Sequence, residues 1–129
     1  NNIYEKDFNN RLRRLGITAS QYAVLNYLFR SQKEEVTQRD IEKNMSLRNP
    51  TVTGLLKRLD EKGFIFSVPS TRDRRCKNIY LAEKAYDIQK RMEAERKKLD
   101  KRLVLGMSKK ESNALCKALE KVLYNIEEP

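Results

Sequence analysis

A predicted helix near the middle of the chain carries a run of small, hydrogen-bonding residues. Residues 48–58 read Arg-Asn-Pro-Thr-Val-Thr-Gly-Leu-Leu-Lys-Arg. At helical spacing, Val52 and the leucines share one face, and small or cationic side chains occupy the other. Small residues let a backbone come close to base edges in a DNA major groove, and cations one turn later reach phosphates. This outer face carries Pro50, Thr51, Thr53, Gly54, Lys57 and Arg58.

The boundaries of this helix follow from its flanking residues. Asn49 is expected to cap it, and Pro50 to take the first helical position, where the missing N–H is not needed. Gly63 suits the position just past its end. The alternative is an ordinary surface helix, but such a helix favours Glu and Lys over Pro, Thr and Gly.

A basic hairpin is expected directly after this helix. Residues 64–68 and 78–81 are rich in strand-forming side chains, and a polar connection of residues 69–77 joins them. Its tip, Arg72-Asp73-Arg74-Arg75, would allow an arginine to enter a narrow minor groove beside the helix. The alternative is a turn that only contacts solvent.

The segments before residue 48 are predicted to be helices that position the recognition helix and the hairpin. A helix over 3–15 has a sparse apolar stripe and ends at Gly16. A capping box at Thr18 opens a second helix, and Thr37-Gln38-Arg39-Asp40 resembles the N-terminus of a short third one. The expected inward residues of the three helices are Ile3, Phe8, Leu12 and Leu15, then Tyr22, Leu25, Leu28 and Phe29, then Ile41 and Met45.

Two further helices are expected after the hairpin. Residues 82–105 form a long helix with a thin apolar line that needs a partner to be stable. A capping box at Ser108 then opens a helix whose broad apolar face spans residues 114–126. We expect this face, with the first helix, to be a dimer contact. The alternative is that it packs only within its own subunit.

Composition narrows the class of protein. The 129 residues carry 28 basic and 18 acidic groups, a net charge of +10, and half of that surplus falls in residues 48–77. Such a concentrated positive field suits nucleic acid.

No histidine is present, which argues against an ordinary hydrolase or metalloenzyme and predicts no metal and no cofactor. Cys76 and Cys116 are too far apart in sequence for a metal knuckle, so reduced thiols are expected, with a redox role for Cys76 left open.

Nothing in the sequence indicates a membrane protein. Apolar stretches are a few residues long, far short of the roughly 18 needed to cross a bilayer, and no secretion signal is visible. The expected location is therefore the cytoplasm.

The order of these elements resembles the MarR (multiple antibiotic resistance regulator) family. The resemblance is carried by the run from Thr51 to Ile65, by Pro69, by Asp73-Arg74-Arg75 and by Leu81. It implies a mainly α fold with a small β-hairpin wing: a winged helix-turn-helix lobe over 18–82, flanked by helical dimerisation regions over 1–17 and 83–129.

The resemblance also implies a role and a set of contacts. Family members are transcriptional regulators that bind pseudopalindromic double-stranded DNA as homodimers and are often released by a small ligand or by oxidation, so a repressor is expected. Asp73 would orient a wing arginine. The expected DNA-binding residues are Thr37, Gln38, Arg48, Asn49, Pro50, Thr51, Thr53, Lys57, Arg58, Asp73, Arg74 and Arg75.

Some positions depart from the family pattern, and the sequence does not identify an effector. Ser67 and Val68 stand where relatives often carry basic residues, so the base of the wing is expected to bind DNA phosphates more weakly. The first helix lacks the cysteine of oxidation-sensing members. Tyr22, Tyr27 and Phe29 are candidates to line a ligand cleft, against the alternative of core packing.

Two rival functions remain open at this point. One is a DNA-architectural protein that has no effector and little sequence specificity. The other is an adaptor whose winged domain binds an acidic protein. Neither a paired acid and base nor a phosphate-cradling glycine loop is present, so an enzyme is the weakest alternative.

Overall fold

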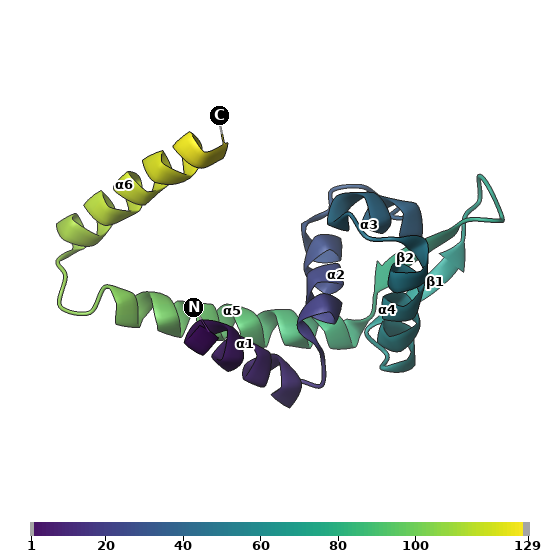
Figure 1. Ribbon diagram of the computed structural model, residues 1–129, viewed down its shortest axis with the longest axis horizontal. Helices are drawn as coiled ribbons and strands as arrows, with labels where there is room; N and C mark the ends of the chain where they lie inside the picture. Colours follow the sequence, from purple (N-terminus) through teal and green to yellow (C-terminus); the bar gives the residue numbers. More distant parts are fainter. Residues whose placement is uncertain (1, 128–129) are drawn as a thin grey trace. The chain divides into compact units, whose positions relative to one another are not determined.

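The computed structural model describes residues 2–127, with the side chains described from residue 6 onward, so the predicted inward position of Ile3 lies outside it. Within these residues the fold is mainly helical, with one antiparallel hairpin (Figure 1). This confirms the predicted fold class. The elements are α1 (Asn2–Arg14), α2 (Ala19–Arg30), α3 (Gln38–Met45), α4 (Asn49–Glu61), β1 (Ile65–Pro69), β2 (Lys77–Leu81), α5 (Glu83–Leu103) and α6 (Lys109–Glu127).

The chain divides into two compact units, residues 1–90 and residues 91–129. The first unit holds α1 to α4, the hairpin and the start of α5. The second holds the rest of α5 and all of α6. None of the described helices is both long enough and apolar enough to cross a membrane.

The core of the first unit draws one to three buried hydrophobic side chains from each of its elements. Its largest fully buried side chains are Leu12, Val24, Leu25, Ile41, Val52, Leu59 and Phe64. In α2 the most buried positions are Gln21, Val24, Leu25 and Leu28. The predicted inward residues Tyr22 and Phe29 are only half-buried, because the buried stripe of α2 is centred on Val24 and Leu28 rather than on the aromatic side chains.

The capping boxes predicted at Thr18 and Ser108 form, and the helix start predicted at Thr37 is a capping box as well. At α2 the backbone N–H of Gln21 donates to Thr18 Oγ1 over 3.2 Å, and that of Thr18 donates to Gln21 Oε1 over 3.1 Å. Thr37 and Ser108 make the same reciprocal pair at α3 and α6. These side chains satisfy N–H groups that a helix start leaves unpaired.

The expected cap of α4 is wrong by one residue. Arg48 occupies the cap position without a side-chain hydrogen bond, so Asn49 and Pro50 are the first two helical residues. Pro50 is still tolerated there, because the first four N–H groups of a helix have no intrahelical partner. The Asn49 side chain is engaged elsewhere, by groups of α3 and α4.

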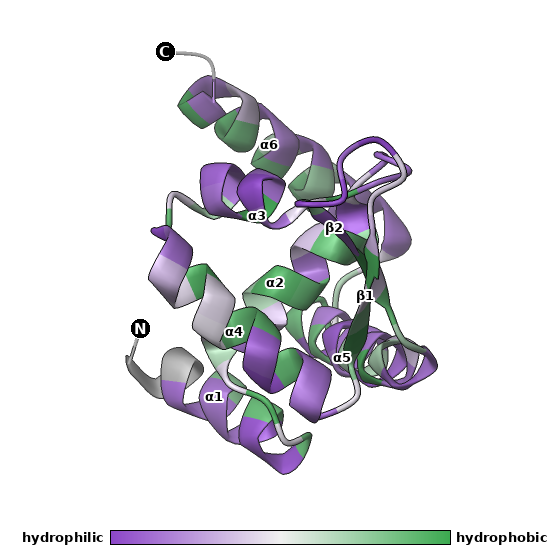
Figure 2. Ribbon diagram, turned by 90° about the vertical axis from the view of Figure 1, so that its right-hand side faces the viewer, coloured by the Kyte–Doolittle hydropathy of each residue, from purple (hydrophilic) through white to green (hydrophobic). Residues whose placement is uncertain are grey.

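The hairpin is paired from Ile65 with Leu81 to Pro69 with Lys77. The segment before α3 lies along its other edge, where Thr37 bridges Asn78 and the N–H of Ile79 donates to the carbonyl of Val36 over 2.8 Å. This extra pairing ties the base of the wing to the start of α3. Figure 2 shows the connecting loop coloured as hydrophilic.

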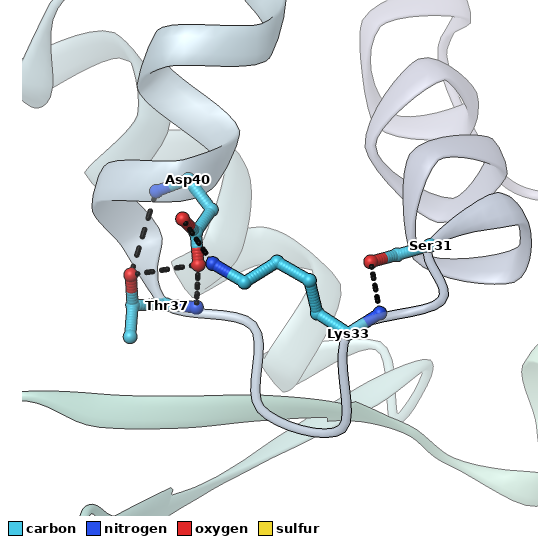
Figure 3. A network of polar contacts seen from close by, with 4 residues as sticks. All are labelled: Ser31, Lys33, Thr37 and Asp40. Atoms are coloured by element: carbon cyan, nitrogen blue, oxygen red, sulfur yellow. Dashed lines mark hydrogen bonds and ion pairs between the residues drawn. The ribbon is translucent and has the colours of Figure 1, made fainter.

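A polar network holds the loop between α2 and α3 (Figure 3). Lys33 Nζ lies 2.8 Å from Asp40 Oδ1, and Asp40 Oδ2 accepts from the backbone N–H of Thr37 over 2.9 Å. Partial burial pushes the pKa of Asp40 upward, but the hydrogen bonds from Lys33 and Thr37 outweigh it and hold this pKa below its usual 3.8. Asp40 therefore stabilises the fold in its ionised form.

Replacing Asp40 with Asn should destabilise the protein at neutral pH by about 1 kcal/mol, which is typical for the loss of a capping interaction. Because the folded-state pKa is lowered, this contribution is present above the unfolded pKa and lost as the pH falls through the folded one. Urea unfolding at pH 7 and pH 3 should show a larger wild-type advantage at pH 7 than at pH 3. The exposed Asp87→Asn variant is the control, and an equal loss in both variants would contradict the role of the network.

The second unit contains an amphipathic helix whose apolar side is uncovered. No residue of α6 is buried. The exposed apolar side chains that share this side are Leu115, Leu119, Val122, Leu123 and Ile126. A face of this size is not left to water in a stable monomer without a reason.

Candidate nucleic-acid interface

Helices α3 and α4 form a helix-turn-helix corner. Ser46 ends α3 in the left-handed conformation, with φ 53°, and the N–H of Leu47 then donates to the carbonyl of Glu42 over 3.0 Å. This tight turn leads directly into α4. Val52, Leu55 and Leu59 anchor one face of α4 in the core, so its opposite face is presented outward.

The outward face of α4 bears most of the predicted recognition residues. Arg48, Asn49, Pro50, Thr51, Thr53, Lys57 and Arg58 are all exposed. Asn49, Thr53 and Lys57 follow one another at intervals of four and so lie along one line of the helix. That line is the edge that faces α3 and the wing.

A chain of hydrogen bonds joins α3 to the first turns of α4. Gln38 Nε2 donates to Thr53 Oγ1 over 2.8 Å and to the carbonyl of Asn49 over 3.4 Å. The Thr53 hydroxyl donates to Asn49 Oδ1 over 3.5 Å, and Asn49 Nδ2 donates to Glu42 Oε2 over 3.1 Å. These contacts hold the polar side chains of the corner in one arrangement before any ligand binds.

Asp73 orients the wing arginine Arg75. Asp73 Oδ1 accepts from the backbone N–H of Arg75 over 3.0 Å and from its Nε over 3.2 Å, which confirms the predicted bond between Asp73 and a wing arginine. The backbone N–H of Arg75, followed by its side chain, lowers the pKa of Asp73. The Arg75 side chain is nevertheless 91% exposed, so its guanidinium is oriented but free to meet an anion.

A groove of about 760 Å³ lies between the corner and the wing. Of the predicted DNA-binding residues, it is lined by Thr37, Gln38, Asn49, Thr53, Lys57 and Arg75. The others, which do not line it, are Arg48, Pro50, Thr51, Arg58, Asp73 and Arg74. The prediction thus named residues on both sides of the groove and others on the surfaces around it.

Sequence reasoning missed several groove residues that carry charge. Arg39, Glu42, Asp60 and Lys77 line the same space. Glu42 stands four residues after Gln38, so helical spacing from a predicted site residue was the available signal. Lys77 ends the connection already singled out as basic. The groove is therefore mainly cationic, with carboxylates interspersed.

The cysteines occupy different surroundings. Cys76 is exposed and lines the groove, and its Sγ lies 3.9 Å from Asp73 Oδ2. Cys116 is exposed on α6. Both thiols are free, as expected from their spacing.

The aromatic residues named as candidates for an effector cleft pack in pairs or line a small pocket. Phe8 and Tyr22 make an edge contact with centroids 5.9 Å apart, and Phe29 and Tyr86 make another at 5.7 Å. Tyr27 lines a separate pocket of about 480 Å³ with residues of α2 and α3. Of the three candidates, Tyr22 and Phe29 thus each pack against another aromatic ring, and Tyr27 lines a pocket.

Comparison with known proteins agrees with this arrangement. Residues 17–77 match the model of the MarR family. Solved structures of Staphylococcus aureus MepR, a transcription regulator of the multidrug efflux pump MepA, superimpose with a TM-score of 0.79 at 27% identity, covering 94% of this chain and 88% of MepR. A MepR–DNA complex matches with a TM-score of 0.67 at 26% identity, over 97% of this chain and 89% of that one.

A second regulator matches over a similar length. The transcription regulator MarR of Oenococcus oeni superimposes with a TM-score of 0.61 at 26% identity and covers 95% of each chain. Its likeness and that of MepR extend beyond the winged segment to the flanking helices. Residues 17–77 thus match the MarR family model, and over nearly its whole length the chain has the fold of a MarR-type transcription regulator.

Proposed function

We propose that this protein is a sequence-specific DNA-binding transcriptional regulator. The observation that carries the proposal is the groove between the α3–α4 corner and the wing, which presents the cations of Lys57, Arg75 and Lys77 beside small polar side chains. A recognition helix of this kind enters a major groove, and an arginine-bearing wing reaches the neighbouring minor groove. The MepR–DNA complex supports the same use of the fold.

The regulator acts as a homodimer on pseudopalindromic operators and represses transcription. Two recognition helices then enter successive major grooves about 34–36 Å apart on one face of the duplex. The uncovered apolar face of α6 supports the dimer, because a second copy is the partner that would bury it in a self-complementary contact. A small-molecule effector would change the separation of the two lobes and so release the operator.

A competition experiment tests sequence specificity. An operator isolated from a random duplex pool should bind at least 10³-fold more tightly than random duplex at the same salt concentration. Equal affinity for both would instead identify an architectural protein that binds DNA without reading it. If this protein bound an acidic protein but had no affinity for DNA, it would be an adaptor.

A further inference from the structure

The hydrogen bonds of the α3–α4 corner consume most of its donor hydrogens. Both hydrogens of Gln38 Nε2 are directed to groups of α4, one to Thr53 Oγ1 over 2.8 Å and one to the Asn49 carbonyl over 3.4 Å. The hydroxyl hydrogen of Thr53 is directed to Asn49 Oδ1. One hydrogen of Asn49 Nδ2 goes to Glu42 Oε2. We call these four side chains the acceptor patch.

What the acceptor patch leaves for a ligand is mostly oxygen lone pairs. Over the part of the chain that the structure describes, neither Gln38 Oε1 nor Glu42 Oε1 accepts a hydrogen bond. Thr53 Oγ1 keeps one lone pair after donating one bond and accepting another. The single donor left is the second hydrogen of Asn49 Nδ2. A partner therefore matches this patch best if it offers an N–H group.

Among the four bases, cytosine fits this demand best. In the major groove it presents only the N4 amino donor, whereas guanine presents two acceptors and thymine one acceptor and a methyl group. Adenine places its N6 donor beside the N7 acceptor, which would face the lone pairs of the patch. A carboxylate is also the side-chain group that accepts a hydrogen bond from cytosine N4.

Resting on the proposed DNA-binding function, we propose that Glu42 is a specificity-determining residue that makes the acceptor patch select a cytosine amino group in each operator half-site. Glu42 acts in two ways. It accepts from Asn49 and so fixes the direction of the whole hydrogen-bonded chain, and its second oxygen remains free to accept from the base. The negative charge of Glu42 also disfavours a DNA phosphate at this place. Lys57, one turn after Thr53 on α4, lines the same groove and is placed to contact the DNA backbone.

The test uses the full chain and compares Glu42→Gln with Glu61→Gln. Glu61→Gln removes the same charge at the exposed end of α4, outside the groove lining. The operator is first selected from a random pool with the wild-type protein. Each half-site cytosine is then replaced by uracil, paired with adenine. This exchanges the N4 amino group for a carbonyl without adding a methyl group, and it replaces the O6 acceptor of the opposite guanine by the N6 amino group of adenine. Affinities are measured by fluorescence anisotropy, and thermal unfolding checks that both variants fold.

We expect one half-site position at which uracil weakens wild-type and Glu61→Gln binding by roughly 10-fold, the usual scale of one base contact. The Glu42→Gln variant should lose this preference, because its amide can donate to the uracil carbonyl while its oxygen still accepts from Asn49. Equal penalties in all three proteins at every cytosine would overturn the inference while leaving the proposed function intact. A preference for adenine at the position that depends on Glu42 would overturn the cytosine assignment. Failure of the wild-type protein to enrich any site would instead overturn the proposed function itself.

Discussion

Replacing Lys57 and Arg75 together with alanine should lower operator affinity by roughly three orders of magnitude. The two side chains stand on opposite sides of the groove, one on the recognition helix and one on the wing. Each homodimer would lose four cationic contacts, and at about 1 kcal/mol per contact the loss is about 4 kcal/mol. The measurement is a titration of labelled operator at fixed salt.

The salt dependence of binding gives a second readout of the same variant. Four lost phosphate contacts should reduce the slope of log affinity against log salt by about 3.6, at about 0.9 for each contact. Lys117→Ala with Lys121→Ala is the matched control, because it removes the same charge from the side of α6 opposite its apolar face. An unchanged operator affinity in the Lys57 and Arg75 variant would refute DNA reading through this groove.

Replacing Leu119 with Glu should convert the protein from dimer to monomer. Leu119 is 51% exposed in the middle of the apolar face of α6, and two copies of a buried carboxylate across a self-complementary contact would be strongly unfavourable. Sedimentation at micromolar concentration should give about 30 kDa for the wild type, twice the 15.2 kDa of one chain, and the mass of one chain for the variant.

Loss of the dimer should also weaken operator binding. Without the link between lobes, the second half-site is no longer bound at a high effective concentration, so affinity for the full operator should fall 10²–10⁴-fold, roughly, while affinity for a single half-site is unchanged. The control is Lys117→Gln, which changes the charge by the same amount on the opposite side of α6. A variant that still sediments as a dimer would show that the apolar face of α6 is not the contact.

Local features of this fold were readable because they involve residues close together in the chain. The capping boxes at Thr18, Thr37 and Ser108 pair residues three apart, and the bond between Asp73 and Arg75 spans two positions. Amphipathic spacing likewise located the helices and the strands of the hairpin to within about two residues of their observed bounds. The error at Asn49 arose because a local rule assigned it a capping role, whereas Glu42 on the preceding helix engages its side chain.

The sequence by itself determined the winged helix-turn-helix, the outer face of α4 and the cationic character of the wing, since each follows from short-range spacing and composition. Only the tertiary structure decided which polar atoms meet. Gln38 reaches Thr53 across 15 positions, and Lys77 joins Lys57 along one groove. Such pairings depend on how two helices cross and how a hairpin packs beside them, and helical periodicity specifies which face is buried but not which neighbour it meets.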